Sequence, residues 1–114
     1  MLLRRDFSRV FAQGFRCQEG PLMAICLANS QGHPRLGLAL RRKTLPRAVD
    51  RNRIKRLARE AFRRDCLGLP ALDIVISAQS RSANQTRFQL AAHLARLLTS
   101  LVSWQQGERS PRSL

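Results

Sequence analysis

The segment at residues 46–65 is the sequence feature that most limits how this chain can fold. Its apolar residues recur at intervals of three and four, the pattern of a helix that buries one face. The stripe consists of Ile54, Leu57, Ala58, Ala61 and Phe62. Thr44 is a suitable N-cap and Pro46 is tolerated in a first helical turn, whereas Gly68 and Pro70 end the segment. Such a helix must pack on another element, which the rest of the chain has to supply.

Strand patterns supply that element. Apolar runs at 22–28 and 72–78 and an alternating run at 35–41 predict strands, and a shorter strand is predicted at 15–18. The run at 72–78 contains three successive β-branched residues, which predicts burial on both faces. These strands are the expected platform for the long helix.

Two further helices complete the predicted set. The first spans 6–13, and the last runs to about residue 104 after a capping box made by Ser82 and Gln85. Its apolar stripe is expected to contain Phe88, Ala91, Leu94, Ala95, Leu98, Leu101 and Val102. The order α-β-β-β-α-β-α predicts an α+β fold, with a mixed sheet and helices packed on it. A chain of 114 residues has room for one domain, expected over 1–106, with a disordered basic tail at 107–114.

The alternating strand at 35–41 has one unusual face. Leu36, Leu38 and Leu40 point toward a core, whereas Gly37 and Ala39 leave the opposite face almost without side chains. A flat ligand or a backbone could approach that face, or the small residues could simply make room for a packed helix. The pattern favours neither interpretation.

Positive charge gathers on the long helix and the residues before it. The chain carries a net charge of +14, and residues 41–64 hold 11 cationic and 2 anionic residues. Asn52, Arg56, Arg59 and Arg63 fall on one row opposite the apolar stripe, and Glu60 can pair with Arg56 or Arg64. A merely solvated face mixes charge signs, and a membrane-binding helix would keep its apolar stripe for lipid. A nucleic-acid partner is therefore the favoured interpretation.

Other function classes find little support. No apolar run is long enough to span a membrane, no secretory signal is visible, and the Arg-rich start only weakly resembles a mitochondrial presequence. Three widely spaced cysteines predict free thiols in a reducing cytoplasm, and the two histidines lack zinc-ligand spacing. No catalytic constellation is recognisable. RNA is preferred to DNA because no helix-turn-helix surrounds the basic helix, while Phe7 and Phe11 could be stacking platforms or core residues.

The basic segment also resembles a known family. Ala48-Val49-Asp50-Arg51-Asn52-Arg53-Ile54-Lys55-Arg56, continued by Arg59-Glu60, is similar to the RNR signature of the bacterial ribonuclease P protein subunit. The segments 6–14, 36–43 and 73–76 resemble that family's first helix and two of its strands, in the same order and spacing.

The resemblance implies an α+β fold like domain 2 of ribosomal protein S5, with a left-handed βαβ crossover. It also implies a cytoplasmic ribonucleoprotein, without membrane contact, that removes the 5′ leader from precursor tRNA. The RNA subunit would be the catalyst and would hold Mg²⁺ together with the substrate, in a 1:1 complex with a protein that binds no metal stably by itself. A standalone RNA-binding protein of ribosomal type is the alternative.

Site residues follow from the resemblance by position. The residues implied to face the RNA subunit are Arg51, Asn52, Arg53, Lys55, Arg56, Arg59 and Arg63. Those implied to line a cleft for the 5′ leader are Phe7, Phe11, Ile25, Ala39, Arg42 and Lys43. This chain departs from the family where Ile25 replaces an aromatic residue and where Gln79 and Ser80 replace basic ones, so Arg81 is a possible substitute.

Overall fold

Strand β4 (Leu72–Ala78) lies inside a four-stranded sheet with the order β1-β2-β4-β3. The computed structural model describes residue 2 and residues 4–104, so the predicted tail lies outside the described residues. Strands β1 (Phe15–Glu19), β2 (Leu22–Ala28) and β4 are antiparallel neighbours, whereas β3 (Arg35–Ala39) runs parallel to β4. The mixed sheet is therefore confirmed, with β1 and β3 at its edges.

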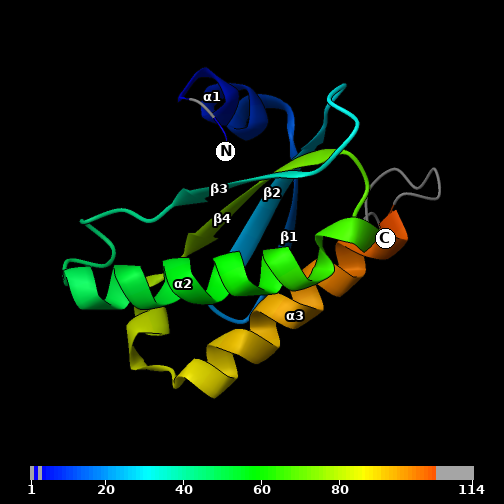
Figure 1. Cartoon of the computed structure of the whole chain (residues 1–114). Helices are drawn as coiled ribbons and strands as arrows, with labels where there is room; N and C mark the ends of the chain where they lie inside the picture. The colour runs from blue at the N-terminus through cyan, green and yellow to red at the C-terminus, as the bar shows by residue number, and fades with distance from the viewer. Residues whose placement is uncertain (1, 3, 105–114) are drawn as a thin grey trace.

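Three helices cover the two faces of the sheet (Figure 1). Helix α1 (Arg4–Gln13) lies on one face, and α2 (Ala48–Asp65) and α3 (Arg87–Trp104) lie on the other. Short 3₁₀ helices at Cys66–Gly68 and Ser80–Asn84 join these elements. The chain passes from β3 through α2 to β4 by a left-handed crossover, a hand taken by only about 2% of such connections.

Each face of the sheet has its own apolar core. Ile74 and Ile76 of β4 point into the larger core under α2 and α3, where Ile54 and Leu94 are also buried. Val75 points the other way, into a smaller core under α1 that contains Leu2, Val10, Ile25 and Val75. The predicted burial of this strand on both faces is confirmed, because successive side chains point to opposite faces.

Helix α2 begins two residues later than predicted. It starts at Ala48, and its N-cap residue is Arg47, without a side-chain capping bond. Thr44 is not the cap: its N–H, like that of Leu45, donates to the carbonyl of Arg41, at 3.2 and 2.8 Å. This turn lets Leu45 enter the larger core, and Pro46 disfavours a helical conformation at the residue before it.

Helix α3 also differs from the prediction, both in its cap and in its buried face. Thr86 and Gln89 form the capping box, at 2.9 and 3.1 Å, while the Ser82 hydroxyl is buried and donates to the Gln79 carbonyl. Phe88 is 74% exposed. The buried face consists of Leu90, Leu94, Leu97, Leu98 and Leu101. Leu94, Leu98 and Leu101 were predicted to be buried, but the helix is rotated so that Leu90 and Leu97 pack into the core while Phe88 and Ala91 are exposed.

Two element boundaries differ from the prediction by two residues each. Helix α1 starts at Arg4 rather than residue 6, and β3 ends at Ala39 because its ladder with β4 ends where Ala39 faces Ser77. None of Cys17, Cys26 and Cys66 forms a disulfide, and burial raises the pKa of the Cys26 thiol above its ordinary value.

Candidate RNA interface

The outer face of α2 carries an exposed cationic row. Asn52, Arg56, Arg59 and Arg63 are all exposed, and with Lys55 and Glu60 they line one shallow hollow of about 350 Å³. The pairs expected for Glu60 are absent, because no acidic partner of Arg56 lies within 4 Å in the described part of the chain and Arg64 pairs with Asp65 instead. The row therefore presents guanidinium groups that are open to an anionic partner.

Arg51 and Arg53 have other contacts. The Arg51 guanidinium donates to the carbonyl oxygens of Leu45 and Pro46, at 2.7 and 3.1 Å. That of Arg53 donates to the Ala83 carbonyl at 3.3 Å. The two side chains hold the loop before α2 and the 3₁₀ helix before α3 in place, whereas the side chain between them, Asn52, is exposed.

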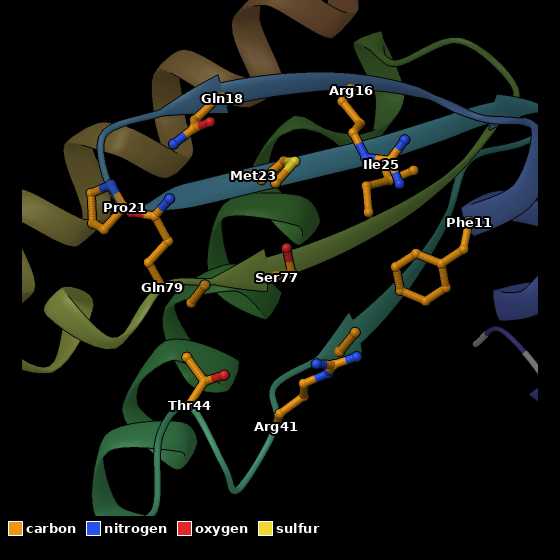
Figure 2. Close-up of a pocket in the computed structure, with 12 residues that line it drawn as sticks. Phe11, Arg16, Gln18, Pro21, Met23, Ile25, Arg41, Thr44, Ser77 and Gln79 are labelled. Atoms are coloured by element: carbon orange, nitrogen blue, oxygen red, sulfur yellow. The ribbon is translucent and has the colours of Figure 1, made fainter.

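A groove of about 380 Å³ lies on the opposite side of the sheet, between α1 and the strands (Figure 2). Its lining includes three of the residues implied for a leader cleft, Phe11, Ile25 and Ala39, and Phe11 is 39% exposed. Phe7, Arg42 and Lys43 are not part of the lining; Arg42 and Lys43 are exposed in the loop after β3. The remaining lining residues are Arg16, Gln18, Pro21, Met23, Arg41, Thr44, Ser77, Ala78 and Gln79.

The low face of β3 is shared between helix α1 and the groove. A Cβ atom on Gly37 would lie 2.7 Å from Cζ of Phe7 and 2.9 Å from Cδ1 of Leu2, so this glycine makes room for α1. Ala39 instead lines the groove. Phe7 consequently packs against the smaller core, and Phe11, one turn later, borders the groove.

Several polar residues of the groove were not among the predicted site residues. Arg16 and Gln18 come from β1, where they alternate with Phe15 and Cys17; this alternation of polar and apolar residues is the sequence signal that could have identified them. Arg81 reaches the far end: its guanidinium donates to Oε1 of Gln79 at 2.8 Å and to the Gly20 carbonyl at 3.1 Å. Arg81 therefore places a cation beside Gln79 at this end of the groove.

A buried carboxylate fixes α1 over the sheet. Asp73 of β4 is fully buried and accepts hydrogen bonds from Arg35 at 2.8 and 2.9 Å, from Asn29 at 2.8 Å and from Arg9 of α1 at 2.8 Å. Burial tends to raise the pKa of Asp73, but the hydrogen bonds from Arg35 and Asn29 together with the charges of Arg35 and Arg9 outweigh it and leave the pKa below its ordinary value. This network ties α1, and with it Phe11, to two strands and a loop.

The β1–β2 turn at the end of the groove is held by α3. Gly20 has a φ of +57°, and a Cβ there would lie 2.5 Å from Cε1 of His93. Glu19 accepts a hydrogen bond from Arg96 at 2.9 Å, which holds the pKa of its carboxyl below the ordinary value. The position of Pro21 and Gln18 in the groove therefore depends on contacts with the other face of the sheet.

These features describe a class of protein: a small, strongly basic α+β domain with a cationic helix on one side and an open groove on the other. Residues 2 and 4–104 contain no group of three His, Cys, Asp or Glu side chains that could hold a metal ion. No helix in the same residues is both long and apolar enough to cross a membrane.

Comparisons with known proteins identify the family. The profile described as Ribonuclease P matches residues 1–102. The ribonuclease P protein component of Methylococcus capsulatus is 39% identical over 106 residues, which is 93% of this chain and 83% of that protein. The ribonuclease P protein component of Escherichia coli O157:H7 is 40% identical over 97 residues, which is 85% of this chain and 82% of that protein.

Solved structures agree. The RNase P protein of Staphylococcus aureus is similar to this chain with a TM-score of 0.79 and 29% identity, over 87% of this chain and 91% of that one. The RNase P protein of Thermotoga maritima has a TM-score of 0.75 and 30% identity, over 86% of this chain and 93% of that one. The chain belongs to the bacterial ribonuclease P protein family, and an RNA subunit is its implied partner.

Proposed function

We propose that this chain is the cytoplasmic protein subunit of a 1:1 complex with the catalytic RNA of ribonuclease P, and that it assists Mg²⁺-dependent removal of the 5′ leader from precursor tRNA. The observation that carries this proposal is the separation of two surfaces of different chemistry. The row on α2 is almost purely cationic, whereas the groove combines apolar residues with a polar rim. Two such surfaces let one small domain bind two RNA segments at once.

The α2 row is suited to the folded RNA subunit. Arg56 and Arg59 are exposed, and neither has an acidic partner within 4 Å in the described residues. Planar guanidinium groups bind phosphate oxygens in a bidentate manner, and each neutralised phosphate releases counterions. Asn52 adds a neutral side chain that both donates and accepts hydrogen bonds, which suits a base edge or a sugar hydroxyl. Lys55 and Arg63 extend the same surface.

The groove is suited to a single strand. Phe11 offers an aromatic ring at its border, and Ile25 and Ala39 give it an apolar base that admits flat groups. Arg16 and Arg41 lie in the lining, on opposite edges of the sheet, where they can pair with phosphates of the leader. Lys43 and Arg42 follow on the exposed loop after β3 and extend the positive charge beyond the groove.

The catalytic groups are proposed to belong to the RNA. A protein Mg²⁺ site requires carboxylates, but the lining of the groove contains none and that of the α2 hollow contains only Glu60. Neither of these two surfaces therefore offers the residues for a magnesium site of its own. Their part is to bind and position the substrate, while the metal is held by the RNA subunit and the precursor.

A cleavage assay tests this proposal against that of a standalone RNA-binding protein. The full chain is added to a bacterial ribonuclease P RNA and precursor tRNA at an Mg²⁺ concentration that is too low for the RNA alone. We expect cleavage at the 5′ end of the mature tRNA only when the chain is present. RNA binding without any gain in cleavage would favour the standalone protein.

The α2 surface is tested separately by salt dependence. Arg56→Ala and Arg59→Ala should weaken binding to the RNA subunit and lower the slope of log K against log [salt] by about 0.7–0.9 for each lost phosphate contact. Arg87→Ala is the matched control, because Arg87 is an exposed arginine of α3 that lies outside the α2 hollow. Wild-type slopes in both α2 variants would contradict the assignment of this surface.

A further inference from the structure

A second hollow lies on the α2 side of strand β3, and the proposed function does not use it. Its volume is about 280 Å³. Leu36 and Phe62, which pack in the larger core, give it an apolar lining, and Arg59 and the exposed His33 also line it. Pro34 and Arg35 complete the lining. An apolar hollow has no obvious use against a sugar-phosphate backbone, which is polar and charged along its whole length.

The hollow is continuous with the cationic row of α2. Arg59 lines both the shallow hollow on that row and the apolar hollow beside β3. An RNA strand that follows the row and places a phosphate at Arg59 therefore passes the mouth of the apolar hollow. The base attached to a neighbouring nucleotide is then within reach of Phe62 and Leu36.

The outer wall of the hollow is fixed in place before any ligand arrives. Asn29 donates to the His33 carbonyl at 3.2 Å and to the buried carboxylate of Asp73 at 2.8 Å. The Gln31 N–H donates to Oδ1 of Asn29 at 2.9 Å. Because the loop is already held by these bonds, a ligand does not have to order it, and this lowers the entropic cost of binding.

We propose that this hollow receives one unpaired nucleobase of the RNA bound along α2. The inference rests on the proposed function, since that function brings RNA to Arg59. Unpaired bases of structured RNA are commonly read on aromatic and apolar side chains next to cationic groups, which is the combination of Phe62, Leu36 and Arg59 found here. An apolar side chain of a protein partner is the competing occupant, but such a side chain gains nothing from the adjoining row of arginines.

Mononucleotides provide a direct test with the unmodified full chain. We expect uridine or adenosine 5′-monophosphate, at millimolar concentration, to shift the NMR signals of the Leu36 methyl groups and the Phe62 ring. Ribose 5-phosphate carries the same phosphate without a base and should leave these signals in place. The methyl groups of Val102, which lines a different hollow, serve as the internal control. Absence of a shift, or an equal shift with ribose 5-phosphate, would overturn the proposal and leave the hollow to a protein side chain.

A variant pair tests the same site in the complex with a ribonuclease P RNA. Phe62→Leu keeps an apolar side chain for the core but removes the ring, and we expect about 5- to 150-fold weaker binding with an unchanged salt slope. His33→Ala should also weaken binding, whereas Gln31→Ala, in the same loop but outside the lining, should not. If Phe62→Leu binds the RNA with wild-type affinity while Arg59→Ala shows a reduced salt slope, the base pocket is rejected and the α2 surface is retained. An unchanged slope for Arg59→Ala would instead reject the underlying α2 surface.

Discussion

Replacing Asp73 by Asn should destabilise the fold more than any other single exchange of a carboxylate. The side chain is fully buried and accepts four hydrogen bonds, three of them from Arg9 and Arg35. Removing one partner of a buried ion pair costs about 3–5 kcal/mol. Because 39% of the Arg9 side chain is exposed and regains water, we expect the lower end, about 3 kcal/mol. Urea unfolding at pH 7 measures this difference.

The loss should also depend on pH in a defined direction. The folded-state pKa of Asp73 lies below its ordinary value, so the carboxylate stabilises the fold above the unfolded-state pKa of about 3.9. This contribution is lost as the pH falls through the lowered folded-state pKa. The gap in free energy of unfolding between wild type and Asp73→Asn should therefore be full at pH 7 and narrow progressively below about pH 3.9.

Asp50→Asn provides the matched control. Asp50 is also buried, but its pairs with Arg47 and Arg53 are long, at 3.6 and 3.9 Å, and the Arg47 side chain is 74% exposed. Its loss, including the favourable interaction with the start of α2, should cost about 1 kcal/mol or less. Equal destabilisation by the two exchanges, or a gap for Asp73→Asn that persists unchanged at acid pH, would refute the reasoning.

Three further exchanges test other parts of the molecule. Phe11→Ala should weaken binding of leader-bearing precursor more than that of mature tRNA, with little change in melting temperature. Equal losses for both ligands would indicate that Phe11 serves the core and does not contact the leader. Thr86→Ala removes the α3 cap that pairs with Gln89 and should cost about 1 kcal/mol in urea unfolding, whereas a Ser82 cap would predict no loss. Gly20→Ala should lower the free energy of unfolding by about 1–2 kcal/mol for its positive φ alone. It should also lower leader affinity, because the new methyl group meets the His93 ring and shifts the turn that places Gln18 and Pro21 in the groove. An unchanged stability would contradict the turn geometry.

The parts of the fold that local periodicity controls could be predicted from the sequence. The bounds of β2 and β4 agree with the apolar runs at 22–28 and 72–78, because each run contrasts with polar or turn-forming neighbours. The two faces of α2 were also predictable, since its apolar and cationic residues are separated by the helical period itself. The Ser82 prediction failed for a local reason: Ser82–Gln85 and Thr86–Gln89 are equally good capping boxes on sequence grounds.

What depends on distant contacts could not be predicted. Asp73 is an ordinary strand residue until the fold brings Arg9 and Arg35, which are 64 and 38 positions away, onto its two oxygens. The different positions of Phe7 and Phe11 likewise depend on how α1 is rotated over Gly37, which no pattern within α1 specifies. The left-handed crossover followed only from the family resemblance, because general rules favour the opposite hand.

The order of strands also sets the timing of folding during synthesis. Both β2 and β3 pair with β4, which is the last of the four strands to leave the ribosome. Until then only the β1–β2 hairpin can form, and β3 has no neighbour to join. The nascent chain must therefore expose its arginine-rich α2 segment, without a sheet to pack against, to the RNA-rich surface from which it emerges. Since pairing partners up to 56 positions apart must wait for the final strand, this small domain is expected to fold more slowly than its size suggests.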